Sequence, residues 1–543
     1  MSSAAPLEYL EVRGESWNAA ADQLVAAISA KALDVGQLKW VDAHNNDPDG
    51  PSIFMACWSS AAPAISSVGM KRKAPNGEQL CLEYHQIDSA EEWPVLYEQA
   101  CTFCRRLHVG QLVSVTCSCN SGGRHMCYVF YDASSVWEET PGSALQLQWV
   151  QASAGSWLSA AQMISQQLGN VASTQKVLAI DAHNSSPTAA ARFVAFFDAH
   201  LAAPPGRIGF VHQNATYGWD QFYRRAMDFA DFGLQTISIT GSNNENGKAV
   251  MFVWYYEEVG KPVFPVPPLT RTLSVMSFNI WCNGGDSLSR TCEVIRHSNP
   301  DVAGLQECSI ETARILALKL RMYYAGNKGG EKGRQSVLSR WPIKPLDGEV
   351  CNAGFKILPP NAPEIAMYNV HLTAYPYAPY ELHQYHKSAV TVEAIEHKTQ
   401  FPSLSPVLRA MRPRMAGSQI VLLTGDFNAA SHVDYPAGPI FPCSTACAAL
   451  GLVDSFDNAR TRGVACGCAN TWSSKAAQEP HGIHDRIDFV YYSRSSGLKV
   501  EESRHLDESN SGVPKYPSDH RAVLTIFQVL DCAESTEPHD ATS

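Results

Sequence analysis

The strongest constraint on the fold is a pattern in the second half of the chain, where short apolar runs are bordered by polar residues of catalytic type. The clearest case is the apolar run at 420–423 (Ile-Val-Leu-Leu), followed at 425–428 by Gly-Asp-Phe-Asn. A short apolar run bounded by a turn signal predicts a buried strand. Asp426 and Asn428 then leave the strand end on one face. Taken alone, Gly-Asp-x-Asn is also an ordinary turn after a strand.

The same pattern recurs along this half of the chain, which makes the turn explanation insufficient for the whole set. The strand ends of a sheet meet at its edge, so polar residues placed there can converge on one site. The further groups are Asn279 after the run 275–278, Glu307 after 302–305, His371 after 366–370, Asp485 and Asp488 before 489–491, and Asp519 with His520 before 522–526.

The order Asn, Glu, His, Asp-x-Asn, Asp and Asp-His resembles the endonuclease/exonuclease/phosphatase superfamily typified by deoxyribonuclease I. The resemblance covers about residues 271–530. It implies an α/β fold, a four-layer α-β-β-α sandwich with the active site at one end. It does not define the substrate, because the same site serves nucleases, sphingomyelinases, inositol polyphosphate phosphatases and poly(A) deadenylases. Ala429-Ala430 after the Asp-x-Asn element departs from the inositol polyphosphate phosphatase pattern.

The resemblance also implies a role for each polar residue in attack on a phosphorus ester. Hard cations such as Mg²⁺ take carboxylate and amide oxygens and neutralise phosphoryl oxygens. Glu307 is then the main metal ligand, with Asn279 beside it and Asp519 as a further ligand. Asp426 is the base that activates water, and Asn428 orients the phosphate. We expect Mg²⁺ as the cofactor, with Mn²⁺ as the alternative ion.

Two histidines complete the expected catalytic set. His520, paired with Asp488, matches the family's cationic imidazole, and such pairing raises an imidazole pKa. His371 matches a second phosphate-contacting histidine that many members carry. Each residue also has a structural explanation by itself: a lone histidine is often a satisfied buried side chain, and the 485–488 segment could be a salt-bridged strand start. The sequence assigns no further substrate-binding residue.

These residues predict a metal-dependent phosphoester hydrolase, acting as a phosphodiesterase or a phosphatase. One alternative is an RNA or DNA nuclease regulated by the first half of the chain. An alternative of another class is an inactive scaffold that binds a partner. Every site residue that the resemblance requires is present, which argues against the scaffold.

The distribution of charged residues favours one class of substrate over another. Residues 1–270 hold 16 Lys and Arg against 25 Asp and Glu, residues 271–530 hold 26 against 24, and the whole chain has a net charge of -11. Binding of nucleic acid draws on clustered cations that release counterions from phosphates, and neither half shows such a cluster. A small phosphoester therefore ranks ahead of duplex nucleic acid.

The first half contains an internal duplication. The segment 41–46 (Val-Asp-Ala-His-Asn-Asn) recurs at 180–185 (Ile-Asp-Ala-His-Asn-Ser), and Ser-Trp recurs with nearly the same offset. Matching helices are expected at 93–107 and 219–232, each followed by a strand pair. We therefore predict two tandem α+β repeat units that bind a ligand or a protein. The Asp-Ala-His-Asn elements fit a turn at a strand end better than a metal site.

These signals divide the chain into five segments. They are repeat unit 1 at 1–142, repeat unit 2 at 143–261, a Pro-rich linker at 262–270, the catalytic domain at 271–530 and an acidic tail at 531–543.

Compartment and cysteine chemistry are less constrained. The start of the chain lacks a basic segment followed by an apolar core, and no run is long enough to span a bilayer, so we expect a cytoplasmic protein. The 16 cysteines are expected mainly as free thiols. A zinc site from the pairs at 101/104 and 117/119 is the weaker alternative, as is a disulfide linking 443 or 447 to 466 or 468.

Overall fold

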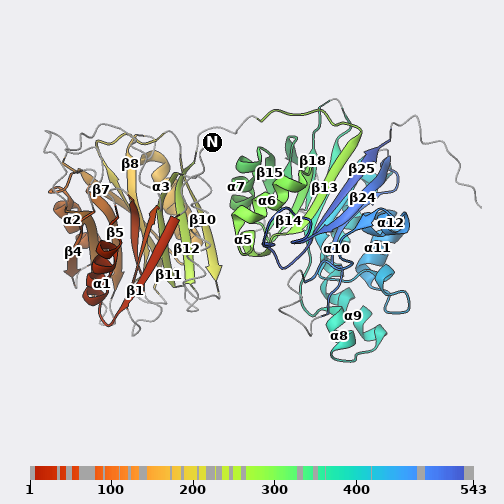
Figure 1. Cartoon of the computed structure of the whole chain (residues 1–543), viewed down its shortest axis with the longest axis horizontal. Helices are drawn as coiled ribbons and strands as arrows, with labels where there is room; N and C mark the ends of the chain where they lie inside the picture. Colours follow the sequence, from red (N-terminus) through yellow and green to blue (C-terminus); the bar gives the residue numbers. More distant parts are fainter. Residues whose placement is uncertain are drawn as a thin grey trace, which may run out of the picture. The chain divides into compact units, whose positions relative to one another are not determined.

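The computed structural model divides the chain into two compact units, Met1–Lys261 and Pro262–Ser543 (Figure 1). Each unit is described by itself. The structure describes residues 7–33, 37–44, 52–59, 80–89, 92–108, 111–119, 124–133, 144–171, 174–184, 189–204, 207–215, 227, 235–243, 249–257, 264–326, 334–346, 353–360, 362–416, 419–473 and 483–530.

The first unit is built from four repeats of three strands, and in the first three of them a described helix lies between the first and second strands. In each, the first and second strands both pair antiparallel with the third. The first repeat contains β1 (Leu7–Gly14), α1 (Trp17–Ala30), β2 (Leu38–His44) and β3 (Ser52–Ser59); the second β4 (Leu82–Ser89), α2 (Trp93–Cys104), β5 (Leu112–Cys119) and β6 (His125–Asp132); the third β7 (Leu147–Ala154), α3 (Trp157–Val171), β8 (Lys176–His183) and β9 (Ala191–Asp198); the fourth β10 (Arg207–Ala215), β11 (Gln235–Asn243) and β12 (Ala249–Glu257).

The register shows that the four repeats are equivalent. The second strand of each has a shift in register near its start, a β-bulge at the same structural position: between Leu38 and Trp40, Leu112 and Ser114, Val177 and Ala179, and Thr236 and Ser238. A bulge is a specific local feature, so its fourfold recurrence indicates a common repeat. Each predicted repeat unit is therefore itself a duplication.

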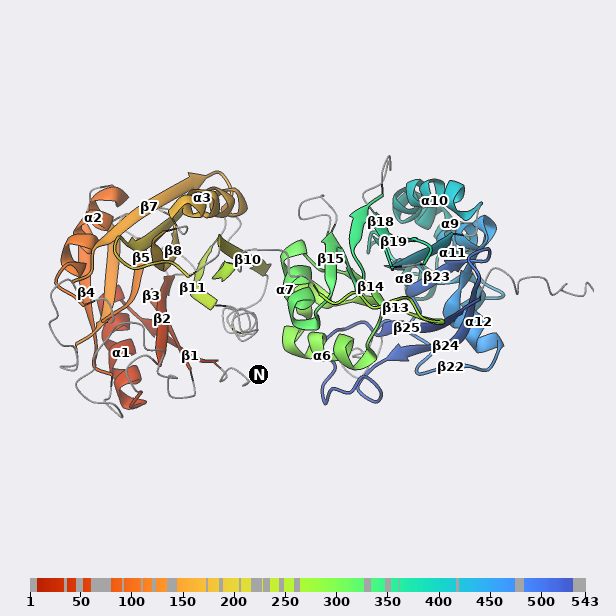
Figure 2. The same cartoon turned by 90° about the horizontal axis from the view of Figure 1, so that it is seen from above.

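The second strands of the four repeats meet in the interior of the unit. Hydrogen bonds link β5 to β2 and to β8, β11 to β8, and β11 to β2. Figure 2 shows these strands toward the middle of the unit, with α1, α2 and α3 around the outside. Most described residues of these strands are buried, including polar ones. The centre of the unit is consequently a hydrogen-bonded polar axis inside a ring of apolar clusters.

Several expectations for the first half are corrected. The initial strand of each repeat was missed, because runs such as 7–14 mix apolar and charged residues. The Asp-Ala-His segments are not turns: Asp42, His44, Asp181 and His183 lie inside buried strands. The expected helix at 219–232 lies almost wholly outside the described residues, as do the boundary near 142 and the acidic tail at 531–543.

The second unit contains two sheets packed face to face. The first has the strand order β15-β16-β14-β13-β25-β24-β22, and the second has the order β17-β18-β19-β20-β23-β21. The strands are β13 (Thr272–Asn279), β14 (Val302–Gln306), β15 (Tyr323–Gly326), β16 (Gln335–Ser339), β17 (Ile343–Pro345), β18 (Gly354–Ile357), β19 (Ile365–His371), β20 (Ile420–Asp426), β21 (Leu452–Asp454), β22 (Ala465–Cys466), β23 (Asp488–Ser493), β24 (Leu498–Leu506) and β25 (Ala522–Val529).

Successive side chains of β20 point to opposite faces of its sheet, which explains how the sheet packs between two layers. Ile420 and Leu422 join the cluster between the two sheets, whereas Val421 and Leu423 join the cluster beneath the helices on the outer face. The helices flank both sheets, which confirms the predicted α-β-β-α sandwich (Figures 1 and 2). They are α5 (Trp281–Gly284), α6 (Leu288–Ser298), α7 (Ile310–Leu320), α8 (Ala378–His383), α9 (Ala389–Thr399), α10 (Phe401–Met415), α11 (Pro442–Leu450) and α12 (Ser455–Thr461).

A buried polar network joins the two sheets below the sandwich end. The amide of Gln306 donates to Asn369 Oδ1 at 2.6 Å, and Thr424 Oγ1 donates to the same atom at 3.0 Å. Gly304 permits this approach, because a Cβ there would lie 2.0 Å from Thr424 Oγ1. The network fixes the spacing of the strands whose ends carry the polar site residues.

Among the described residues, helices long and apolar enough to cross a membrane are absent.

Candidate active site

Strand register brings the predicted site residues to one end of the sandwich. In the parallel pair β13 and β14, Asn279 lies opposite Gln306, the residue before Glu307. In the other sheet, His371 pairs with Asp426, and Asp426 pairs with Asp488 across β20 and β23. Because the sheets pack face to face, these two sets meet between them.

Asp426 is the centre of the group. Its side chain is buried, and its Oδ2 accepts a hydrogen bond from Asn279 Nδ2 at 2.9 Å. The same oxygen lies 3.5 Å from His371 Nε2 and 3.6 Å from His520 Nε2. Its other oxygen accepts from the backbone N–H of Asn428 at 2.9 Å. One carboxylate therefore contacts groups from both sheets.

Glu307, the residue directly after β14, adjoins this centre. Its Oε2 accepts from the backbone N–H of Cys282 at 2.7 Å, and Asn279 Nδ2 donates to its Oε1 at 3.3 Å. Burial acts to raise the pKa of Glu307. The opposite effects of His371, the backbone N–H of Cys282 and His520 are together larger, so the pKa lies below its usual value. Glu307 also has a positive φ of 54°, a conformation that is uncommon outside glycine and recurs at functional sites.

His520 and Asp488 form a buried pair. His520 Nδ1 donates to Asp488 Oδ2 at 2.9 Å, which leaves Nε2 facing Asp426. Burial acts to lower the pKa of His520, but the carboxylates of Asp488 and Asp426 together raise it well above its ordinary value. The imidazole is therefore held as a cation, with one N–H directed toward the centre of the site.

The remaining predicted residues surround this centre. His371 is partly exposed at the end of β19. Asn428, with a positive φ of 46°, donates through Nδ2 to the carbonyl of Leu372 at 3.1 Å. Asp519 is partly exposed beside His520, with Ser518 Oγ 3.5 Å from its Oδ1. The structure thus brings the predicted residues to one end of the sandwich, while their individual roles stay predictions.

Comparison with known proteins agrees with this geometry. The model of the Endonuclease/Exonuclease/phosphatase family matches residues 276–520, a range that begins in β13 and ends at His520. This region belongs to the endonuclease/exonuclease/phosphatase family. Proteins of the family act on phosphoester bonds and generally use a divalent metal ion. The region is therefore a phosphoesterase domain in its broad class.

Solved structures show similarity over about half of the chain. A form of TDP2 from D. rerio, humanized by 14 mutations, has 16% identity and a TM-score of 0.34, covering 48% of this chain and 99% of that one. Endonuclease/exonuclease/phosphatase proteins from Beutenbergia cavernae and Bacteroides thetaiotaomicron have 18% and 16% identity and TM-scores of 0.33 and 0.35, covering 48% and 51% of this chain and 72% and 100% of theirs. No curated protein matches the chain.

The donor chemistry of the candidate site fits a hard divalent cation. The site gathers buried carboxylates, and Asp488 Oδ1 has no hydrogen-bond partner in the described part of the chain. Glu307 Oε1 faces the site while Oε2 is fixed by the backbone. Asn279 contacts both carboxylates through its nitrogen, because its oxygen accepts from Trp281 N–H at 2.9 Å. Metal binding by Asn279 therefore requires its amide to turn over.

Three residues of the site were not assigned from the sequence. Thr471 Oγ1 accepts from the backbone N–H of Asp488 at 3.0 Å, and Trp472 packs on His520 with ring centroids 4.9 Å apart. Ser518 Oγ accepts from His520 N–H at 3.1 Å and donates to the carbonyl of Asn279 at 2.7 Å. In the sequence, Thr471 and Trp472 stand in the short segment Asn-Thr-Trp at 470–472 and Ser518 precedes Asp519, and neither position indicates these contacts.

The loops next to the site contain further buried polar contacts. Tyr377 is buried and packs its ring against Tyr380. Tyr377 and Tyr435 both donate to Asp485, and burial raises the pKa of that carboxyl. Arg486 pairs with Asp434 and Asp454, so the 485–488 segment also contains a structural ion pair.

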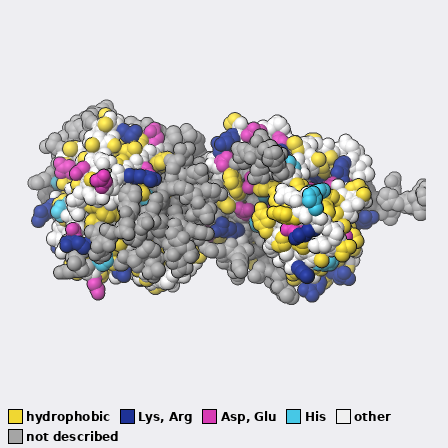
Figure 3. Space-filling view, turned by 90° about the horizontal axis from the view of Figure 1, so that it is seen from below, with side chains coloured by type: hydrophobic (Ala, Val, Ile, Leu, Met, Phe, Trp, Pro, Cys, Tyr) yellow, Lys and Arg dark blue, Asp and Glu magenta, His cyan; other side chains and the backbone are white. Residues whose placement is uncertain are grey.

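The surface of this unit combines hydrophobic and histidine side chains in the view of Figure 3. Large exposed hydrophobic residues of the segment around α8, α9 and α11 are Tyr375, Tyr385, Val390 and Ile440. Cys443 and Cys447 are buried, Cys466 and Cys468 are exposed, and all four are free thiols, so the weaker alternative of a disulfide between these pairs is not seen.

Proposed function

We propose that the second unit is a metal-dependent phosphoester hydrolase in which water attacks phosphorus with Asp426 as the base. The observation that carries this proposal is the position of Asp426 Oδ2, within 3.6 Å of His520 Nε2 and hydrogen-bonded to Asn279. A carboxylate in contact with a cationic imidazole can take a proton from water next to a group that stabilises phosphoryl oxygens.

The other side chains of the site have separate proposed roles. The N–H of His520, held by Asp488, donates to an oxygen on which negative charge develops. His371 and Asn428 border the same space and orient the phosphoryl group. Ser518 and Trp472 position His520 rather than contact the reacting atoms.

We propose Glu307 as the principal metal ligand, with Asn279 and Asp519 as further ligands and Mg²⁺ as the ion, Mn²⁺ being the alternative. When bound, such a cation neutralises phosphoryl charge and stabilises the leaving oxygen. The low pKa of Glu307 supports this role, because a ligand must be ionised to bind the cation.

A small or weakly charged phosphoester is the proposed substrate class. Residues 271–530 are nearly balanced in charge, whereas binding of nucleic acid through the backbone draws on an excess of cations. Cleavage of RNA or DNA is the alternative outcome. The first unit is proposed to bind a ligand or a protein, and the protein is proposed to act in the cytoplasm.

The test is the initial rate of hydrolysis of bis(p-nitrophenyl) phosphate and p-nitrophenyl phosphate, together with plasmid DNA, RNA and sphingomyelin. Each is measured with Mg²⁺, with Mn²⁺ and with EDTA, for the wild-type chain and for Asp426→Asn. Cleavage that needs metal and is lost in the variant supports the proposal. Full activity in EDTA, or in the folded variant, contradicts it. Silence on every substrate without measurable Mg²⁺ binding favours the inactive scaffold.

A further inference from the structure

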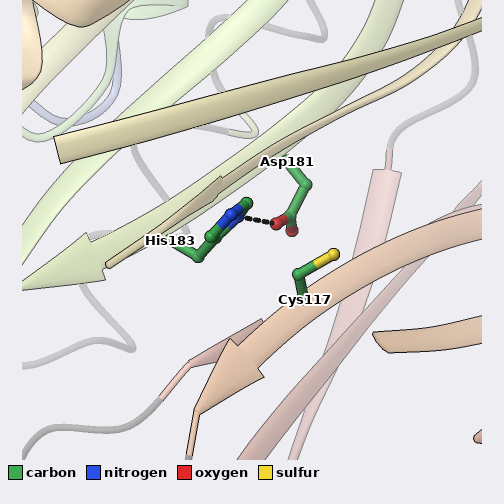
Figure 4. A group of neighbouring side chains, drawn as sticks. All are labelled: Cys117, Asp181 and His183. Atoms are coloured by element: carbon green, nitrogen blue, oxygen red, sulfur yellow. Dashed lines mark hydrogen bonds and ion pairs between the residues drawn. The ribbon is translucent and has the colours of Figure 1, made fainter. Parts of the chain in front are cut away.

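A second cluster of potential metal donors lies in the interior of the first unit. It consists of Cys117 from β5 and Asp181 and His183 from β8, all buried. One donor atom from each lies within 4.8 Å of the donor atoms of the other two. Figure 4 shows the three side chains close together, with the Asp181 carboxylate between His183 and Cys117 and hydrogen-bonded to His183.

Each of the two polar donors has its other atom fixed by a separate partner. His183 Nδ1 donates to Asp181 Oδ2 at 2.8 Å, while its Nε2 accepts from the Tyr97 hydroxyl at 2.6 Å. Thr116 Oγ1 donates to Asp181 Oδ1 at 2.9 Å. The atoms left to face one another are Nδ1, Oδ2 and the sulfur. Outer partners of this kind orient the ligands in protein metal sites.

The internal repeat supplies a matched comparison. In the shared register, Asp42 and His44 correspond to Asp181 and His183, while Gly241 on β11 corresponds to Cys117 on β5. At that second junction Gly241 donates its backbone N–H to Asp42 Oδ2 at 3.1 Å. The Asp-x-His pair is thus common to both junctions, whereas the sulfur is present at one of them. A purely structural Asp-His pair does not need it.

We propose that Cys117, Asp181 and His183 bind one Zn²⁺ ion. Thiolate, imidazole and carboxylate together are a donor set that Zn²⁺ accepts, with a fourth position open to water. Binding releases the thiol proton to solvent and moves the ring proton of His183 from Nδ1 to Nε2, which then donates to the Tyr97 oxygen while the Tyr97 hydroxyl proton turns away from the ring. The neutral imidazole that this requires agrees with a pKa of His183 that burial lowers, against the opposing effect of Asp181.

The ion would join β5 to β8, the junction between the two halves of the first unit. Without the ion, the buried carboxylate, the neutral imidazole and the thiol carry a total charge of -1. With the ion bound, the carboxylate and the thiolate together carry -2, which the divalent ion neutralises. Zinc should therefore stabilise the folded first unit by cross-linking its halves.

The test uses the full chain with Mg²⁺ in excess, so that the phosphoesterase site is occupied, and Co²⁺ as a spectroscopic substitute for zinc. We expect a thiolate-to-cobalt charge-transfer band that zinc abolishes, and about one zinc per chain after gel filtration. Zinc should also raise the Tm of the wild-type chain. Absence of both the band and bound zinc in the wild-type chain overturns the proposal.

Variants locate the site. Cys117→Ser should lose the band and the zinc, while Cys127→Ser, which alters the buried thiol opposite Cys117 on β6, should retain both. Asp181→Asn keeps an acceptor for Thr116 and should weaken zinc binding at least about tenfold, so it serves if Cys117→Ser does not fold. Loss of the band in Cys127→Ser, or its retention in folded Cys117→Ser, refutes this donor set.

Discussion

Both units bury an aspartate-histidine pair, yet the imidazole charge differs between them. His520 donates through Nδ1 to Asp488 at 2.9 Å, and His183 donates through Nδ1 to Asp181 at 2.8 Å. Burial acts to lower the pKa of both imidazoles. The resulting pKa of His520 is nevertheless well above its ordinary value, whereas the resulting pKa of His183 is below it. One carboxylate at hydrogen-bonding distance does not by itself determine the charge.

The second ring nitrogen accounts for much of the difference. His520 Nε2 lies 3.6 Å from Asp426, so a second carboxylate favours the cation. His183 Nε2 accepts from the neutral hydroxyl of Tyr97, and nearby Arg192 further opposes protonation. The same pair is therefore a cationic group in a phosphoester site and a neutral, metal-compatible group in the repeats.

The largest expected effect is that of Asp426→Asn, which removes both the proposed base and the second carboxylate. Turnover should fall roughly 10²- to 10⁴-fold, and Glu307→Gln should lower it 100-fold or more by weakening metal binding. In Asp426→Asn, NMR titration should show the pKa of His520 moving down toward that of His183. Circular dichroism establishes that both variants fold. Normal folding with full activity in both would refute the assignment of the site.

Much of the geometry of the candidate site could be predicted from the sequence because strand ends and short motifs are local. The runs ending at Asn279 and Asp426 specify buried strands, and parallel pairing then brings their ends to one edge. The contacts of Thr471 and Ser518 could not be predicted in this way. Each depends on the path of a loop, which hydrophobic periodicity does not encode.

In the first unit, less of the fold could be predicted from the sequence. Its duplication was visible because Asp-Ala-His recurs, but the odd-numbered repeats have Asp and His where the even-numbered ones have Thr and Ser. This alternation concealed the fourfold repeat, which only the shared bulges reveal. It also explains the wrong turn prediction, because buried polar strand residues have partners in other repeats, such as Thr116 with Asp181.

A second prediction concerns the other aspartate-histidine pair of the repeats. His44 Nδ1 lies 3.6 Å from Asp42 Oδ2. Burial lowers the pKa of His44 to about 3, while nearby Glu11 acts to raise this pKa and Arg13 acts to lower it. The unfolded pKa is near 6.5, so the folded state binds fewer protons between these values. The resulting stability is present above pH 6.5 and is lost as pH falls toward 3, by up to about 5 kcal/mol.

Hydrogen exchange of peptides from the first unit, measured between pH 7 and 4.5, checks this. Exchange should reveal weakening protection as pH falls, and His44→Gln should reduce the change because glutamine does not titrate. A wild-type chain whose first unit keeps constant protection over this range would contradict the neutral state of His44.

The third prediction tests burial without an imidazole partner. Glu396 on α9 accepts from the backbone N–H of Cys443 at 2.7 Å, and burial raises its pKa to about 7. The folded state therefore binds more protons than the unfolded state between about pH 4.5 and 7. Stability is full below this range and falls by about 3 kcal/mol as pH rises through it.

Glu396→Gln keeps an acceptor for Cys443 and removes the ionisation. Denaturant unfolding followed by tryptophan fluorescence at pH 5 and pH 8 should show a variant less sensitive to pH than the wild-type chain, and more stable than it at pH 8. An equal pH dependence in both proteins would show that another group is responsible.

The smallest expected effect belongs to Asp488→Asn, which separates orientation of His520 from its charge. The amide can still accept from Nδ1, so the ring stays in place against Trp472, but one of the two carboxylates that raise its pKa is removed. Turnover should fall roughly 10- to 100-fold, less than for Asp426→Asn. The loss should be smaller at low pH, where the imidazole regains its proton, and a pH-rate profile measures this. A loss of equal size at every pH would mean that the loss does not arise from the charge of His520, and that Asp426 suffices to keep the imidazole charged.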